Sequence, residues 1–321
     1  MATSPENMSL VADIGGTNTR VALAQGHAVN ESSIARYRNA DYSNLSDILE
    51  AYMADQDTSV AAACVAIAGP VRDGRAEMTN LSWVFDCDAL QAATGADRTA
   101  ILNDLQAQGY ALSHVPQKNI AQIIVGEPNG KPSSALVIGL GTGVNIAPVL
   151  QTENGLFSPP AEAGHISLPV YHPDDLALAD FIAKEHGFAA VEDALSGRGL
   201  EQLYAFHAAQ AGQTVDIRAA EVMERLKSGD DEIAQQAGRH YVRSLGGFCG
   251  DMALIHLPFG GVYLVGGVAR AIAPYLKQFG FEDAFKAKGR FEDFLTEFSV
   301  SLVEDDYAAL TGCAAFMDPN G

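Results

Sequence analysis

The sequence predicts an α/β protein of two domains, because its length, its alternation of strands and helices and a long-range repeat all indicate that class. The 321 residues exceed the roughly 100–200 residues of one typical domain, and 48% of them are apolar. A strand, a glycine turn and a second strand occur at residues 9–25 and again at 134–150. This repeat indicates a duplicated α/β unit, whose ligands are expected at the carboxyl ends of the strands.

The first third of the chain is predicted to form one such unit. Apolar runs that end in glycine or polar residues indicate strands, and apolar side chains at intervals of three and four indicate helices. Strands are predicted at residues 9–14, 19–25, 60–69, 76–80 and 99–104, and helices at 42–53 and from 106 onward.

The same alternation resumes after residue 119 and predicts the second unit. Strands are predicted at residues 120–126, 134–143, 144–150, 261–267 and 299–304, and helices at 176–186, 191–195, 216–227, 231–256 and 307–317. Neither a low-complexity tract nor a short repeat interrupts this pattern.

The acidic excess excludes two classes of partner. The chain has 40 acidic and 20 basic residues, which gives a formal net charge of −20. Nucleic acids and anionic membrane surfaces should repel it. A phosphate-bearing ligand would therefore have to be held by local backbone donors and a metal ion.

The cysteines and the N-terminal segment indicate a reduced, cytoplasmic protein. Cys64, Cys87, Cys249 and Cys313 show no C-x-x-C spacing, so we expect core residues rather than a zinc or dithiol site. The N-terminal segment has no basic region of the kind that begins a signal peptide. The longest apolar stretches are far shorter than the ~20 residues of a membrane span.

Two glycine loops follow predicted strands at equivalent places in the two units. Residues 13–18 read DIGGTN and residues 139–143 read GLGTG. Glycines let backbone N–H groups approach a phosphate closely, and Asp13 offers the hard oxygen that Mg²⁺ prefers. The alternatives are a polar β-turn for the first loop and a glycine-rich hairpin for the second. Their recurrence in two half-repeats favours phosphate binding.

A second group of candidates consists of polar residues at strand ends and in loops. Asn103 and Asp104 end a buried strand, where Asp104 could accept a proton from an attacking hydroxyl; the alternative is capping of the next helix. Glu162 and His165 could hold sugar hydroxyls or a metal, or could lie in a surface turn. Glu192 alone is an ordinary helix acid.

Seven motifs in order resemble one family. They are DIGGTN (13–18), MTNLSW (78–83), LND (102–104), GLGTG (139–143), EAGH (162–165), LSGRGL (195–200) and VGGV (265–268). The chain resembles bacterial glucokinases of the non-zinc group, within the sugar-kinase, heat-shock-protein and actin superfamily. The resemblance spans residues 9 to about 317 and implies two ribonuclease-H-like (actin-like ATPase) domains with the active site in a cleft between them.

The resemblance also implies domain boundaries and a reaction. A small domain of residues 1–110 and 303–321 and a large domain of residues 111–302 are expected. The implied enzyme is a hexose kinase that phosphorylates D-glucose to glucose 6-phosphate with ATP and Mg²⁺, with Asp104 as the general base. The alternatives are a kinase for another hexose or amino sugar, a non-catalytic sugar sensor and an actin-like ATPase. The oligomeric state stays open, a homodimer included.

The resemblance assigns residues to each ligand. The residues implied to bind glucose are Asn80, Asn103, Asp104, Glu162, His165 and Glu192. The residues implied to bind ATP are Ala12, Asp13, Ile14, Gly15, Gly16, Thr17, Gly141, Thr142, Gly143, Gly266 and Gly267, with Gly266 and Gly267 on the adenosine side and Asp13 as the metal ligand.

Three positions depart from the family pattern. Ala12, Ala161 and Ala163 stand where the family usually has glycine, and a methyl group at each is expected to narrow a loop. The cysteine-rich zinc motif of the related repressor and kinase family is absent, and no helix-turn-helix segment precedes residue 9. Both observations argue against a sugar-responsive repressor.

Overall fold

The chain forms two compact units. A computed structural model describes residues 8–78, 81, 83–127 and 134–318. The first unit contains residues up to 117, together with 151–160 and 305 onward, and the second contains residues 118–150 and 161–304. The predicted division placed the boundaries at 110/111 and 302/303 and did not assign residues 151–160 to the first unit.

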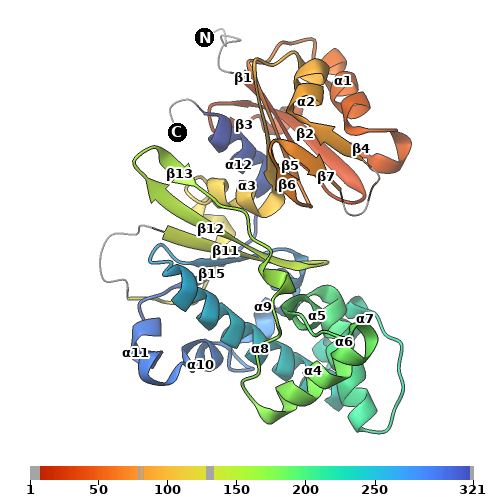
Figure 1. Ribbon diagram of the computed structural model, residues 1–321, viewed down its shortest axis with the longest axis vertical. Coiled ribbons are helices and arrows are strands. Elements are labelled where there is room, and N and C mark those ends of the chain that lie inside the picture. The colour runs from red at the N-terminus through yellow and green to blue at the C-terminus, as the bar shows by residue number, and fades with distance from the viewer. Residues whose placement is uncertain (1–7, 79–80, 82, 128–133, 319–321) are drawn as a thin grey trace. The chain divides into compact units, whose positions relative to one another are not determined.

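The first unit is built on a six-stranded sheet (Figure 1). Its order is β3-β2-β1-β5-β9, with β4 paired to β2, and β6, β7 and β8 form a small separate sheet. The elements are β1 (Met8–Ile14), β2 (Asn18–Gln25), β3 (Ala28–Val29), β4 (Ala35–Arg38), α1 (Leu45–Gln56), β5 (Ala62–Ile67), β6 (Val71–Arg72), β7 (Arg75–Glu77), β8 (Val84–Asp86), α2 (Cys87–Thr94), β9 (Arg98–Asn103), α3 (Asp104–Ala111) and α12 (Ala308–Met317).

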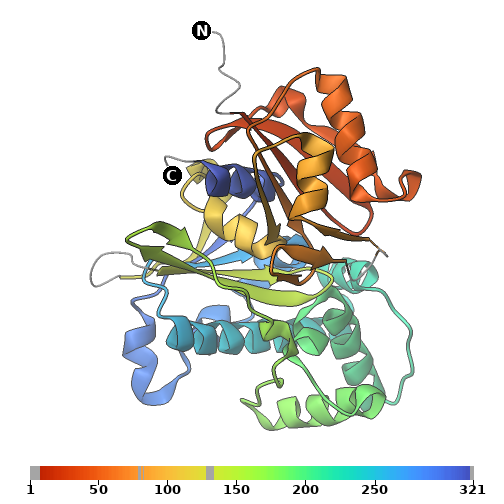
Figure 2. The same ribbon diagram turned by 45° about the horizontal axis from the view of Figure 1, so that its top comes forward.

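Both faces of this sheet are buried, which explains the continuous apolar runs of β1 and β5. Along β1, Leu10, Ala12 and Ile14 face α1 and α2, whereas Val11 faces α3 and α12. Successive strand residues point to opposite faces, so a strand covered on both sides must be apolar throughout. Figure 2 shows α3 (yellow) beside α12 (blue), and α1 beside α2, as their contacts require.

The second sheet has the order β10-β15-β14-β11-β12-β13. The elements of this part of the chain are β10 (Ile120–Ile124), β11 (Ser134–Leu140), β12 (Val144–Thr152), β13 (Gly155–Phe157), α4 (Pro173–His186), α5 (Val191–Leu195), α6 (Gly197–Gln210), α7 (Ala219–Ser228), α8 (Glu232–His256), β14 (Val262–Val265), α9 (Gly267–Leu276), α10 (Phe281–Lys286), α11 (Glu292–Leu295) and β15 (Val300–Val303).

The two sheets repeat one topology, which confirms the predicted duplication. In each, a hairpin is followed by two parallel strands: β2-β1-β5-β9 in the first and β12-β11-β14-β15 in the second. The hairpin pairs β1–β2 and β11–β12 are antiparallel. The pairs β1–β5, β5–β9, β11–β14 and β14–β15 are parallel.

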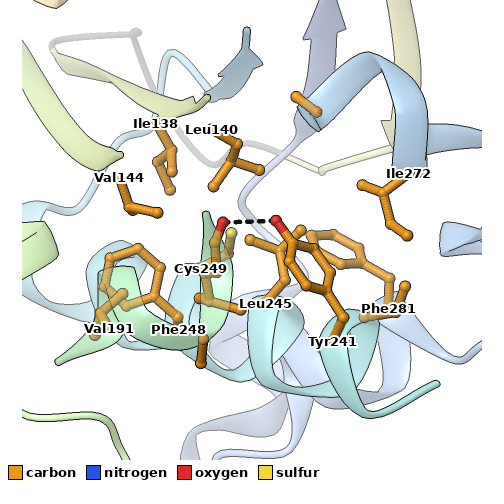
Figure 3. Close-up of a cluster of buried hydrophobic side chains, with 14 of the residues drawn as sticks. Ile138, Leu140, Val144, Val191, Tyr241, Leu245, Phe248, Cys249, Ile272 and Phe281 are labelled. Atoms are coloured by element: carbon orange, nitrogen blue, oxygen red, sulfur yellow. Dashed lines mark hydrogen bonds between the residues drawn. The ribbon is translucent and has the colours of Figure 1, made fainter. Parts of the chain in front are cut away.

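Helix α8 forms the centre of the second core. Tyr241, Leu245 and Phe248 are fully buried and share a cluster with Ile138 and Leu140 of β11 (Figure 3). The Tyr241 hydroxyl donates a 2.6 Å hydrogen bond to the carbonyl oxygen of Leu195, so its polar end is satisfied inside this core. The predicted helix at 231–256 is therefore confirmed within one residue.

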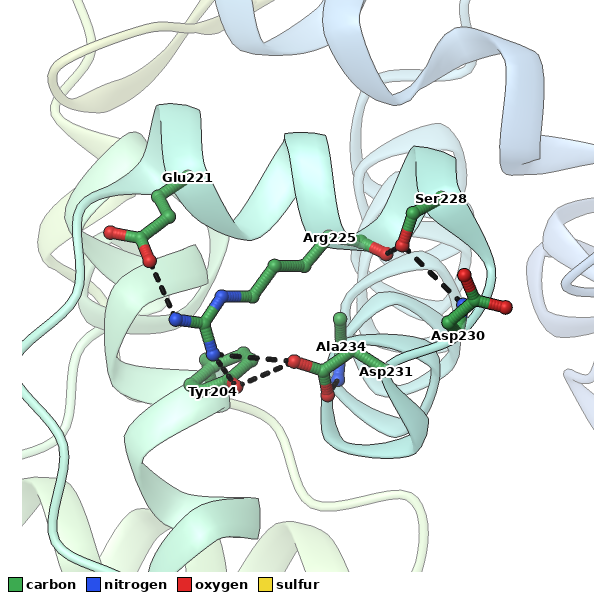
Figure 4. A network of polar contacts seen from close by, with 7 residues as sticks. All are labelled: Tyr204, Glu221, Arg225, Ser228, Asp230, Asp231 and Ala234. Atoms are coloured by element: carbon green, nitrogen blue, oxygen red, sulfur yellow. Dashed lines mark hydrogen bonds and ion pairs between the residues drawn. The ribbon is translucent and has the colours of Figure 1, made fainter.

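Helices α6, α7 and the start of α8 are joined by a polar network (Figure 4). The Arg225 guanidinium donates to the Tyr204 hydroxyl at 2.6 Å and to the Asp231 carboxylate at 3.3 Å, and Tyr204 donates to Asp231 at 2.8 Å. Asp231 also caps α8 by accepting the N–H of Ala234. One carboxylate thus starts a helix and ties it to two others.

Two further predictions are tested by the described residues. All four cysteines are free; Cys64, Cys249 and Cys313 are buried, as predicted, whereas Cys87 is partly exposed. Within the described part of the chain, none of the helices combines the length and the hydropathy that a bilayer span requires.

Candidate active site

The carboxyl edge of the first sheet brings the predicted acidic residues together. Ile14 of β1 pairs in register with Ile67 of β5, and Ile67 pairs with Asn103 of β9. Asp13 and Asp104 lie one residue to either side of this row, at the same edge of the sheet. This is the place where open α/β sheets bind their ligands.

Asn103 caps helix α3. Its Oδ1 accepts the backbone N–H of Leu105 at 3.0 Å, and Gln106 returns the contact by accepting the N–H of Asn103 at 3.2 Å. Its Nδ2 donates to the carbonyl oxygen of Gly69 at 3.1 Å. The capping alternative is therefore confirmed for Asn103, and the cap fixes where α3 begins.

Asp104 is the first residue of α3 and has an unusual acidity. One carboxylate oxygen accepts the backbone N–H of Leu105 at 2.9 Å. Burial and the nearby charge of Asp13 raise the pKa of Asp104 to about 7. Hydrogen bonds from the backbone N–H of Leu105 and from the Asn103 side chain oppose this shift. A carboxyl group with this pKa can exchange a proton near neutral pH.

Asp13 is held from one side by Arg20. The guanidinium Nη1 lies 3.3 Å from Oδ2 of Asp13 and also donates to the carbonyl oxygen of Asp306 at 3.1 Å. Burial raises the pKa of Asp13, although Arg20 opposes the shift. Mg²⁺ prefers oxygen ligands, and the neighbouring carboxylates of Asp13 and Asp104 offer them. The residues present therefore fit this metal.

The loop after β1 is braced by Asn39, a residue that the sequence analysis missed. The Asn39 side chain donates to the carbonyl oxygen of Gly15 at 2.8 Å and accepts the hydroxyl hydrogen of Thr19 at 2.8 Å. Gly16 and Thr17 at the tip remain exposed. The brace fixes the loop base and leaves its tip accessible to an anion.

In the second unit, the loop after β11 meets the starts of two helices. The Gly197 N–H at the start of α6 donates to the carbonyl oxygen of Gly141 at 2.9 Å. Gly266, which precedes α9, has φ +102°, and a Cβ there would collide with the carbonyl oxygen of Leu140. This close approach places Gly266 against Leu140, the residue before the loop at 141–143, as expected where Gly139 of β11 pairs with Val265 of β14. Helix starts present free N–H groups to anions.

Glu192 is more than an ordinary helix acid. Its Oε2 accepts the N–H of Val144 at 3.0 Å, and its Oε1 lies 3.2 Å from Nη2 of Arg198. A Cβ on Gly143 would collide with the same carboxylate, so any larger residue there would require the Glu192 side chain to move. Glu192 therefore contacts the loop predicted to bind phosphate.

Glu162 precedes the short 3₁₀ turn Ala163–His165 and His165 is its last residue, and both side chains are exposed. A Cβ on Gly164 would collide with the carbonyl oxygen of Val144, so this turn packs directly on the start of β12. Asn145 of β12, which the sequence analysis also missed, donates to the Glu162 carboxylate at 3.2 Å.

The methyl groups that replace family glycines lie in the cores. Ala12 is fully buried in the first unit and Ala163 is 8% exposed in the second. Ala161 packs against the second core. The side chains of Ala12 and Ala163 point into the cores, and the expectation that they narrow ligand loops stays a prediction.

Most of the predicted residues fall into two groups, one in each unit. Asp13, Asn103 and Asp104 share one sheet edge of the first unit. The second unit brings Glu192 into contact with the loop at 141–143, and Gly266 beside that loop. The predicted glucose ligand Asn80 lies outside the described residues.

Comparison with known proteins identifies the family of the chain. Residues 10–320 match the family model described as Glucokinase. The glucokinase of Erwinia tasmaniensis is 31% identical over 310 residues, which cover 96% of each chain. The glucokinase of Yersinia enterocolitica is 30% identical over 311 residues, again 96% of each chain.

Solved structures show the same fold. The crystal structure of a glucokinase from an Antarctic psychrotroph has a TM-score of 0.87 and 29% identity, covering 98% of this chain and 99% of that one. A ROK family glucokinase from Streptomyces griseus, solved with glucose and AMPPNP, has a TM-score of 0.64 and 20% identity, covering 98% and 100%.

Proposed function

Because the chain belongs to the glucokinase family, its reaction is the ATP-dependent phosphorylation of glucose, and we propose that Asp104 is the general base for the sugar's 6-hydroxyl. The observation that carries this role is a half-buried carboxyl group at a sheet edge, with a pKa raised to about 7. A base must be ionised near working pH and yet be basic enough to take a proton, and this pKa meets both conditions.

Glucose would be oriented by the polar side chains that the family resemblance assigns to it. Asn103 beside Asp104 is held by its cap, and Glu162, His165 and Glu192 offer two carboxylates and an imidazole to neighbouring hydroxyl groups. Fixing a hydroxyl in line with the transferring phosphoryl group removes entropy from the barrier. Asn80 would join this set.

The phosphates of ATP would be held by backbone N–H groups in the two glycine loops and at the start of α9. Asp13 would hold Mg²⁺, which supplies neutralisation of the phosphate charge when bound. Arg20 would favour the ionised form of Asp13 against the effect of burial and would fix its position, because its guanidinium lies against one oxygen. The transition state of phosphoryl transfer is loose, so positioning and charge neutralisation account for most of the catalysis.

The test is Asp104→Asn, which keeps the shape of the side chain and removes the base. We expect kcat to fall by ~10²–10⁴, the usual effect of losing a general base, while glucose dissociation changes by less than about tenfold. ADP release would be measured with glucose, fructose and N-acetylglucosamine, and glucose binding by calorimetry.

A matched control is Asp88→Asn, which changes an exposed aspartate in the first turn of α2 in the same unit. It should leave kcat at the wild-type value. Near-normal turnover of glucose by Asp104→Asn would assign Asp104 to the start of α3 alone and overturn its role as base.

A further inference from the structure

We propose that Asn145 is a positioning residue for glucose: its side-chain amide holds the loop at residues 161–163 and orients the Glu162 carboxylate. The inference rests on the proposed role of Glu162 as a sugar ligand. Asn145 is not among the residues that the family resemblance assigns to either substrate, and it lies on β12 rather than in the loop that it holds.

Three hydrogen bonds join Asn145 to the loop. Its Nδ2 donates to the carbonyl oxygen of Ala161 at 2.6 Å and to Oε2 of Glu162 at 3.2 Å. Its Oδ1 accepts the N–H of Ala163 at 3.0 Å. One planar amide therefore contacts three consecutive residues, and its bonds to Ala161 and Ala163 hold the backbone on both sides of Glu162.

The backbone partners fix which way the amide faces. A carbonyl oxygen can only accept, so Ala161 requires the NH₂ group on its side. A backbone N–H can only donate, so Ala163 requires the oxygen of Asn145. The second hydrogen of the NH₂ group then points to the Glu162 carboxylate, which is the only one of the three contacts with a charged partner.

The position of Asn145 in the strand explains why it can act on the loop. Its neighbours Val144 and Ile146 are buried in the core of the second unit, and residues alternate between the two faces of a strand. Asn145 thus projects from the opposite face, toward the 161–163 loop, and is only half-buried.

An exposed carboxylate has to be ordered before it can hold a sugar hydroxyl. Glu162 is exposed, and long acidic side chains lose rotamer freedom when a ligand fixes them. A donor already in contact with Oε2 reduces that loss at binding and leaves Oε1 for the sugar. Ala161 and Ala163, which replace family glycines, are held by the same amide.

The primary test is Asn145→Ala, with glucose binding measured by calorimetry and with separate KM values for glucose and ATP. We expect glucose dissociation and the KM for glucose to rise about 10- to 100-fold, the usual effect of removing a hydrogen bond to a charged group. The KM for ATP should change less than about threefold, since the side-chain hydrogen bonds of Asn145 go to residues 161–163 and to the N–H of Ile146, and not to the glycine loop at 141–143.

A second variant tests whether Asn145 orients the Glu162 carboxylate or only fills space beside the loop. Asn145→Asp has the same shape, but it loses both donors and places a carboxylate next to that of Glu162. We expect it to bind glucose more weakly than Asn145→Ala. If Asn145 only filled space, the isosteric aspartate would bind glucose as the wild type does, and the inference would be overturned.

The double variants test the route through Glu162. If Asn145 acts by orienting that carboxylate, then adding Asn145→Ala to Glu162→Gln should weaken glucose binding by less than about threefold further. If the increase in the glucose dissociation constant of the double variant equalled the product of the increases in the two single variants, the residues would act independently and the inference would be overturned. Thermal melting of each variant shows whether the second unit is folded, and Asn145→Asp keeps the test valid if Asn145→Ala unfolds.

The variants Glu162→Gln, Asn145→Ala and Asn145→Asp also distinguish the role of Asn145 from the proposed sugar contact of Glu162. Should Glu162→Gln bind glucose like the wild type, the proposed sugar contact of Glu162 fails, and the role of Asn145 fails with it. Should Glu162→Gln weaken glucose while Asn145→Ala does not, only the role of Asn145 is overturned. A loss of glucose binding in all three variants, with an unchanged KM for ATP, supports both.

Discussion

Asp104 carries a free-energy cost that most surface carboxylates avoid. Burial disfavours its ionised form, and the carboxylate of Asp13 adds repulsion, so the pKa rises to about 7. In the free enzyme, part of the population then holds Asp104 protonated at neutral pH. A cation at Asp13 would reduce the repulsion and lower the pKa of Asp104, so substrate binding itself would help to ionise the base.

The first prediction at this scale concerns pH. A base works only when ionised, so kcat/KM for glucose should fall about tenfold per pH unit below pH 7. Since kcat reports the enzyme with substrates and metal bound, its acidic limb should lie at lower pH than that of kcat/KM. Initial rates between pH 5.5 and 8.5 at saturating Mg²⁺ would measure both limbs. A kcat/KM that stays constant down to pH 5.5 would contradict the assignment.

At the scale of elements, the helix that presents Asp104 depends on a glycine in another helix. Helices α3 and α12 cross so closely that a Cβ on Gly312 would collide with the carbonyl oxygen of Ala107. Residues of both helices share one buried cluster behind the sheet. The approach leaves no space for even a methyl group, so the position of α3 is set by the composition of α12.

We therefore predict that Gly312→Ala destabilises the protein by about 1–3 kcal/mol, the usual cost of overpacking, even though alanine favours helices. Thr311→Ala, one residue earlier in α12 and only partly buried, is the matched control and should change the free energy of unfolding by less than about 0.5 kcal/mol. Urea denaturation would measure both. Equal stability of the two variants would show that α3 and α12 can separate at little cost.

Elements with strong local patterns could be predicted from the sequence. The glycine hairpins at β1–β2 and β11–β12 follow from apolar runs that stop at glycines, and α8 follows from its long apolar periodicity. Helix α6 was missed, because Gly197 and Gly199 disfavour helices locally. It forms where Ser196 caps it, and Gly199 allows its first turn to approach the backbone of Ala194.

In the candidate site too, contiguous motifs could be predicted from the sequence, whereas residues that act on a distant part of the chain could not. Asp13, Asp104 and the glycine loops could be predicted because each motif is contiguous in the sequence. Asn39 and Asn145 could not, because each acts on a loop or carboxylate 16 to 24 residues away along the chain. An asparagine in a strand carries no local sign of a distant partner, so only the fold reveals it.

At the scale of the whole molecule, the net negative charge repels ATP but does not affect the approach of glucose. The chain carries a formal charge of −20, glucose is neutral, and ATP remains anionic when it binds Mg²⁺. Two basic side chains at the candidate sites are already engaged: Arg20 lies against Asp13, and Arg198 against Glu192. The long-range field should therefore slow the approach of the nucleotide while leaving the sugar unaffected.

The final prediction follows from screening. Raising the ionic strength from 0.01 M to 0.15 M shortens the Debye length from about 30 Å to about 8 Å, which removes most of the long-range repulsion. With free Mg²⁺ held constant, kcat/KM for ATP should rise by roughly two- to tenfold as KCl is added, whereas kcat/KM for glucose should stay constant. Glucose serves as the internal control, because an effect of salt on the fold or on Asp104 would change both constants. A fall in kcat/KM for ATP with added salt would contradict the argument. It would mean that the backbone N–H groups of the glycine loops, together with Arg20 and Arg198, create a local positive potential that outweighs the net charge of the chain.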